Sequence, residues 1–162
     1  MKYFYWTLTI IVIAILGYGY TLNPGGDKKA ETNSPAPRPT REVVVYLSKN
    51  DANKIVPVAV SRLVVGKTDA EVALAALREL VKGPTLAEID QGYLTAIPDG
   101  VVVNSVSIEG DTAIADFNDK LDTPTSGAPL ITTIIHDQIV GTLQQFAKQV
   151  KITIGGSRKA KL

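Results

Sequence analysis

Four aspartates in the second half of the chain are the residues best suited to acid–base chemistry: Asp111, Asp116, Asp119 and Asp122. Two carboxylates can hydrolyse a glycoside when they are suitably separated and one of them has a raised pKa. Aspartates are also ordinary residues of turns and helix starts. A calcium loop would need a bidentate glutamate at its twelfth position, which this spacing lacks. We therefore expect structural roles for all four, with a cell-wall hydrolase as the alternative.

The single histidine, His136, stands next to Asp137 in a segment with helical periodicity. Neighbouring residues of a helix point about 100° apart, so we do not expect these two side chains to face each other. The chain has no cysteine and no serine in a Gly-x-Ser-x-Gly turn that a histidine could activate. Zinc-ligand spacing and a phosphate-binding glycine loop are also missing. The sequence predicts no catalytic residue, no metal site and no cofactor.

Charge is distributed unevenly along the 162 residues. Residues 43–156 carry nine basic and thirteen acidic side chains, whereas the last six residues carry three basic ones. An acidic body repels phosphate backbones, so nucleic acid is excluded as a partner, and no small-molecule substrate is indicated. The absence of cysteine rules out disulfides, thiolate metal sites and a lipid-modified N-terminal cysteine.

Residues 3–20 form an uncharged, mostly apolar run with aromatic side chains at both ends. As a helix the run would be roughly 27 Å long, close to the thickness of a bilayer core. The aromatic ends suit the two membrane interfaces. A cleaved signal peptide is the alternative, although Gly17-Tyr18-Gly19 is a poor cleavage site. We expect an uncleaved single-pass anchor over residues 1–20, with the amino terminus inside and the body outside.

Residues 21–42 are rich in proline and glycine and predict an extended spacer. β-Branched runs at 43–47 and 55–65, with a polar turn at 48–53, predict a hairpin whose proline strand lies at an edge. Thr68 and Glu71 match a capping box, in which the Glu71 carboxylate accepts from the amide of Thr68. The helix that follows ends at a left-handed Gly83.

The second half predicts a hairpin over residues 101–109 and 112–117, a helix from Pro129 to about Lys148, and a closing strand at 150–154. The expected fold class is α+β: a small sheet of about five strands, formed by two hairpins and a closing strand, carries two amphipathic helices. An N-terminal transmembrane helix precedes it. The expected divisions are an anchor (1–20), a linker (21–42), a folded domain (43–156) and a basic tail (157–162).

Five short motifs in order resemble the GerMN domain of sporulation and spore germination proteins. They are Val-Tyr-Leu at 45–47, Leu-Val-Lys-Gly-Pro-Thr at 80–85, Ala-Ile-Pro-Asp-Gly at 96–100, Ala-Asp-Phe-Asn at 115–118, and Gln-Ile-Val-Gly-Thr-Leu at 138–143. The family-motif residues, taken as structural, are Gly83, Pro84, Thr85, Ile97, Pro98, Gly100, Asp116, Phe117 and Thr142.

The resemblance implies an exported, membrane-tethered α/β domain that acts in extracytoplasmic assembly and has no established catalytic residues. This chain departs from many members because it lacks the lipid-anchoring cysteine and ends in a basic tail. Such domains also occur outside spore formers, so the resemblance does not establish a germination role. Arg158, Lys159 and Lys161 are candidates for contact with anionic polymer or lipid, and a solvated terminus is the alternative.

These observations lead to one expected function and one alternative. We expect a non-enzymatic binding or assembly module on the outer side of a bacterial cell membrane, in a cell-envelope or sporulation-type complex. Its partner would be an envelope protein or peptidoglycan, and strand addition at a sheet edge is one mode of contact. The alternative is a cell-wall hydrolase that uses the acidic cluster.

We predict that the full-length chain fractionates with membranes, whereas residues 43–162 alone are soluble. The apolar run at 3–20 is the segment that needs lipid, while the body hides its apolar faces internally. Membrane fractionation with a high-salt wash tests this. Release of the intact chain by salt alone would contradict the anchor.

Overall fold

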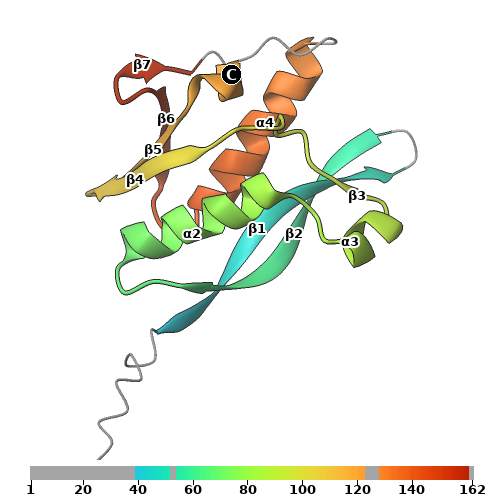
Figure 1. Cartoon of the computed structure of the whole chain (residues 1–162), viewed down its shortest axis with the longest axis horizontal. Coiled ribbons are helices and arrows are strands. Elements are labelled where there is room, and N and C mark those ends of the chain that lie inside the picture. Colours follow the sequence, from blue (N-terminus) through green and yellow to red (C-terminus); the bar gives the residue numbers. More distant parts are fainter. Residues whose placement is uncertain (1–38, 52–53, 123–127, 161–162) are drawn as a thin grey trace, which may run out of the picture. The chain divides into compact units, whose positions relative to one another are not determined.

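Two β-sheets and the helices packed against them make up the described part of the chain (Figure 1). The computed structural model describes residues 39–51, 54–122 and 128–160. One sheet has three strands in the order β2-β1-β3, and the other has four in the order β4-β5-β6-β7. The strands are β1 (Thr40–Asp51), β2 (Lys54–Val65), β3 (Tyr93–Leu94), β4 (Val103–Glu109), β5 (Thr112–Phe117), β6 (Gln149–Ile154) and β7 (Arg158–Lys159).

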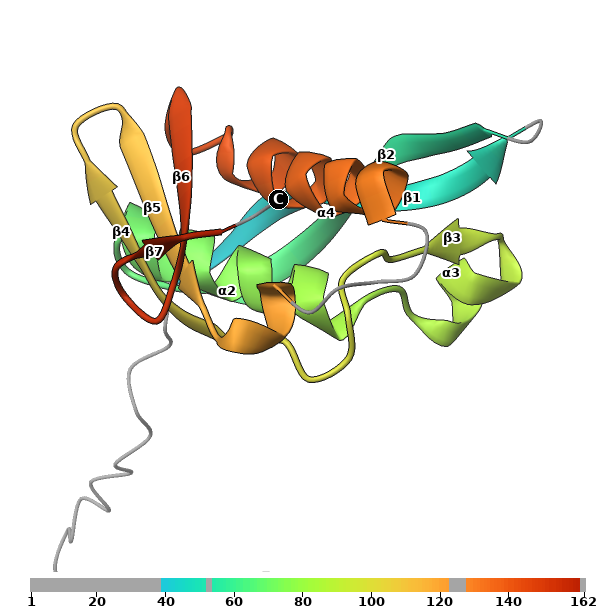
Figure 2. The same ribbon diagram turned by 90° about the horizontal axis from the view of Figure 1, so that it is seen from above.

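The predicted α+β class is confirmed, but the prediction of a single sheet is wrong. Helix α2 (Asp69–Lys82) contacts β1 and β2 of one sheet and β4 of the other, and so lies between them (Figure 2). In the four-stranded sheet, β6 pairs with β5 in parallel. Helix α4 (Ala128–Leu143) packs on α2 and β1. Apolar periodicity predicted five of the seven strands and missed the two-residue strands β3 and β7, and it does not show which strands pair across an intervening helix.

The predicted anchor and most of the predicted linker lie outside the described residues. Within the described ranges, no helix is long and apolar enough to cross a membrane. Strand β1 begins at Thr40, inside the stretch predicted as linker. At the other end, β7 pairs with Thr153 and Ile154 of β6, so part of the predicted basic tail belongs to the four-stranded sheet.

The first hairpin is longer than predicted. Residues 48–51 were expected to form a turn, but they continue β1 and pair with residues 54–57 of β2. The polar side chains that suggested a turn belong instead to the end of a long two-stranded ribbon. Pro57 lies on β2, which is an edge strand as predicted.

Helix α2 begins and ends at the predicted residues, but one hydrogen bond at its start differs from the prediction. Thr68 Oγ1 accepts from the amide of Glu71 at 3.2 Å, as predicted, but the Glu71 carboxylate accepts from the amide of Lys67 at 2.6 Å and not from that of Thr68. Gly83 ends the helix with φ 76° and ψ −166°. Its φ is positive as predicted, but its ψ lies outside the left-handed helical region.

Strand β1 is paired along its length with β2 on one side, whereas β3 pairs with only two of its residues on the other. Side chains at the C-terminal end of α4 bond to the strand where β3 is missing. Thr142 Oγ1 accepts from the amide of Tyr46 at 3.0 Å. Gln145, just beyond the helix, accepts from the amide of Val44 at 3.0 Å and donates to its carbonyl oxygen at 2.7 Å. A helix thus takes the place of a third strand.

The close approach of α4 to β1 depends on Gly141. A Cβ atom at this position would lie 3.0 Å from Cγ and Cδ2 of Tyr46. A larger residue would push the helix away from the strand and stretch the bonds made by Thr142. The glycine is therefore required by packing and not by a positive φ.

We predict that Gly141→Ala lowers the free energy of unfolding by about 1–3 kcal/mol, the usual cost of overpacking. The same change at a helix position with free space would stabilise by roughly 1 kcal/mol. Urea unfolding of residues 39–162 measures the effect. A double-mutant cycle with Tyr46→Ala supplies the control, because removing the ring should make Gly141→Ala neutral or stabilising. A stabilising Gly141→Ala in the presence of Tyr46 would contradict the packing argument.

Candidate functional site

A buried glutamine on α4 connects three elements near the point along β1 where its neighbour changes from α4 to β3. Gln138 is 1% exposed, donates from Nε2 to Ser48 Oγ at 3.2 Å, and accepts at Oε1 from the amide of Ala96 at 3.1 Å. These bonds fix α4 to β1 and to the segment that follows β3. Buried polar groups without partners are costly, so this link holds the three elements in one arrangement.

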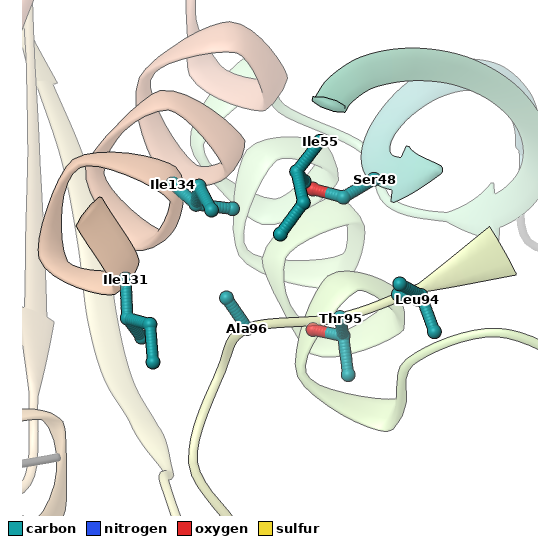
Figure 3. Close-up of a pocket in the computed structure, with 7 residues that line it drawn as sticks. All are labelled: Ser48, Ile55, Leu94, Thr95, Ala96, Ile131 and Ile134. Carbon is teal, nitrogen blue, oxygen red and sulfur yellow. The ribbon is translucent and has the colours of Figure 1, made fainter. Parts of the chain in front are cut away.

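An apolar groove lies between these three elements (Figure 3). Its cavity volume is about 290 Å³. The first turns of α4 form one wall, the end of the β1–β2 hairpin another, and β3 with the residues after it the third. The lining residues are Ser48, Ile55, Leu94, Thr95, Ala96, Ile131 and Ile134.

Large apolar side chains remain accessible around the groove. Ile55 is 44% exposed, Leu94 is 45% exposed, and Leu130 is 63% exposed beside a neighbouring hollow that Ile55 also lines. Apolar patches with a concave centre are typical of binding surfaces. None of the seven lining residues has a titratable side chain. The groove can therefore bind an apolar group but offers no acid or base.

Asp116 is held by internal hydrogen bonds and is largely buried, at 8% exposure. Its carboxylate accepts from Asn104 Nδ2 at 2.8 Å, from Thr153 Oγ1 at 2.9 Å and from the amide of Gly156 at 2.6 Å. Burial raises the pKa of Asp116, but these hydrogen bonds lower it by more, so the pKa lies below its ordinary value. A general acid needs the opposite shift.

Asp111 lies at the opposite end of β5 from the other three aspartates. Asp111 lies at the turn before β5 and pairs with Lys148 at 2.8 Å on the surface. Asp119 and Asp122 lie in the 3₁₀ helix η1 (Asp119–Asp122), beyond the other end of that strand. A strand of six residues is about 20 Å long, so the two ends cannot share one substrate bond. No group of three or more His, Asp or Glu within the described ranges could hold a metal ion.

His136 and Asp137 lie on the surface of α4. Contrary to the prediction from helical geometry, the two side chains approach, with Nδ1 3.4 Å from Oδ1. Both side chains are about half exposed, at 49% and 58%. They stand in open solvent, and neither lines the groove.

The comparisons with known proteins agree with this fold. The profile of the Germane family, described as sporulation and spore germination, matches residues 44–160. The chain belongs to this family. The predicted resemblance to the GerMN domain is thereby confirmed.

Two solved GerMN structures are similar to the chain. The first GerMN domain of the sporulation protein GerM from Bacillus subtilis is 26% identical, with a TM-score of 0.52, over 75% of this chain and 86% of that structure. The tandem GerMN domains of the same protein are 23% identical, with a TM-score of 0.58, over 73% of this chain. The match spans 40% of the tandem structure's length. No curated protein matched the chain.

None of the nine family-motif residues of this GerMN domain lines the groove, although Ala96 of the Ala-Ile-Pro-Asp-Gly motif does. Ile97, Phe117 and Thr142 are buried, and Gly83 and Gly100 have positive φ. Thr85 caps the short helix α3 (Leu86–Asp90). Pro84 and Pro98 lie in the connections before α3 and β4. The anion contact of Arg158, Lys159 and Lys161 stays a prediction.

The groove residues were missed by the sequence-based prediction of this GerMN domain. They come from β1, β2, β3 and α4 and have ordinary apolar side chains. One signal was available: Gln138, Thr142 and Gln145 form a polar stripe at helical spacing within an otherwise apolar segment. Such a stripe indicates a helix that bonds to something other than solvent.

We predict that Asp116→Asn lowers the free energy of unfolding by about 1–3 kcal/mol at neutral pH, as expected for a hydrogen-bonded buried group. A lowered folded-state pKa stabilises above the ordinary aspartate pKa, and this contribution disappears as the pH falls through the folded-state pKa. The gap between wild type and variant should therefore narrow in acid. Urea unfolding from pH 7 down to pH 2 measures it, and Asp111→Asn is the exposed control. A gap that widens in acid would contradict the assignment.

Proposed function

We propose that this GerMN domain is a membrane-anchored, extracytoplasmic, non-enzymatic assembly module that binds protein through its apolar groove. The proposal rests on the groove, because its surface is concave, its apolar side chains are accessible, and none of its lining residues is titratable. The acidic residues favour the module over the hydrolase, because the Asp116 carboxylate already accepts three hydrogen bonds within the domain. The related protein GerM is a sporulation protein, which favours an envelope or sporulation-type complex.

The position of the groove suits a tethered domain. The apolar run and linker precede β1, which starts at Thr40. The groove lies at the far end of the β1–β2 hairpin, about ten residues or 30 Å along the strand. The groove is therefore remote from Thr40, the first residue of β1.

Strand addition at the outer edge of β2 is the less favoured mode of contact. Because the amide of Tyr46 faces α4, antiparallel pairing turns residues 57, 59, 61 and 63 of β2 toward the outer edge. Pro57 has no amide to donate there, and the carbonyl oxygen of Ser61 already accepts from Arg62 Nη1 at 3.2 Å. An incoming strand would therefore find one backbone donor missing and one backbone acceptor already occupied within a short stretch of β2.

We expect the purified body to release no soluble fragments from cell-wall sacculi, whether or not it sediments with them. Wild-type residues 39–162 and the Asp111→Asn/Asp119→Asn variant are compared for co-sedimentation and fragment release. Both aspartates are exposed, so the variant should keep its fold, and Asp116 is left intact because it supports β5 and β6. Fragment release by the wild type that disappears in the variant would replace the module with a hydrolase.

A further inference from the structure

Helix α3 exposes two large apolar side chains on one side. Leu86 is 82% exposed, the highest value among the large apolar residues of the described ranges, and Ile89 is 52% exposed. Residues three apart lie on the same face of a helix, so the two form one small projection. Asp90, which follows directly, is also exposed.

The projection is held rigidly from the opposite side of α3. Glu88 accepts from Arg62 of β2 at both oxygens, with Nη1–Oε1 at 2.8 Å and Nη2–Oε2 at 2.6 Å. The two charged side chains are each only 15% exposed. Glu88 also accepts from the amide of Thr85 at 2.7 Å and completes a capping box. Because Glu88 faces β2, Leu86 and Ile89 point away from the sheet.

The surroundings of the groove complement this projection in charge. Lys54 is exposed beside Ile55 and Leu130 at the end of the hairpin. Lys49, whose Nζ lies 5.1 Å from the centroid of the Tyr93 ring, follows Ser48 on β1, so its side chain lies on the opposite face of the strand from the groove. The α4 wall adds no charge, because residues 128–135 are all neutral. Lys54 is therefore the cation beside the groove, and Asp51 is its exposed cross-strand neighbour. An exposed lysine at the edge of an apolar groove favours an apolar group that is flanked by a carboxylate.

We propose that α3 of one copy inserts Leu86 and Ile89 into the apolar groove of a second copy, with Asp90 beside Lys54 of that copy. The inference rests on the proposed function, since it names the partner of the same groove. The projection and the groove are different surfaces, so two copies can exchange the contact reciprocally or the contact can run head-to-tail through further copies. Anchoring in one membrane would raise the effective concentration of a weak contact.

The absence of cysteine from the chain gives a direct test. Two full-length copies with different epitope tags are co-expressed, one with Ile89→Cys and the other with Leu130→Cys, and membranes are treated with an oxidant. We expect a disulfide-linked species that carries both tags. Both positions are more than half exposed, so the substitutions should not disturb folding. Each variant expressed alone controls for other pairings.

Leu63→Cys replaces Ile89→Cys in the matched control, because Leu63 is 74% exposed but lies elsewhere on β2. Cross-linking of Ile89→Cys with Leu130→Cys no stronger than this control would overturn the proposal. Within the cross-linking pair, Lys54→Glu should reduce the yield several-fold, and Asp90→Lys in the partner copy should restore it. Loss without restoration would also count against the contact. Cross-linking that fails while the domain still binds another envelope protein through the groove would overturn this inference and leave the proposed function standing.

Discussion

Strand β1 pairs along its whole length with β2 on one side but with only two residues of β3 on the other. On that second side, side chains at the end of α4 bond to the backbone of Val44 and Tyr46. The bond to the amide of Tyr46 is partly buried and those to Val44 are exposed, so each contributes about 0.5–1.5 kcal/mol, and the helix cannot slide along the strand without losing them. Gly141 lets the helix come close enough, since Tyr46 occupies the space that a Cβ would need. The rest of the three-stranded sheet is arranged around this contact.

The groove follows from the same constraint. The C-terminal half of α4 is fixed to β1 by Thr142, and Gln138 ties the helix to Ser48 and to the segment after β3. Toward its first turns, Ile131 and Ile134 face the hairpin end across an open space. The residues best suited to chemistry serve a different purpose, as Asp116 shows by bonding to β4, to β6 and to the turn after β6. Asp116, the most buried of the four aspartates, thus has a structural role, and the accessible apolar surface favours the binding function proposed for the groove.

Local signals in the sequence predicted local structure well. The second hairpin, the end of α2 at Gly83 and the edge position of Pro57 follow from turn chemistry and the special backbone of glycine and proline. The family followed from five motifs in order, and it is confirmed. Failures arose where several interpretations fit the same residues. Residues 48–51 have turn composition yet extend a strand, because the end of a ribbon is as polar as a turn. The separation into two sheets and the groove could not be predicted, since residues as distant as Ser48 and Ile134 meet only through tertiary packing.

Hydrogen exchange of the full-length chain tests the central claim, that the groove is the working surface, without knowledge of the partner. Exchange is compared between native membranes and the same protein extracted and diluted. The account predicts slower exchange in membranes at residues 54–56, 93–96 and 130–134, which surround the groove. Exchange around Asp111 and Asp119 should be the same in both samples. Protection at the aspartates with none at the groove would contradict the account.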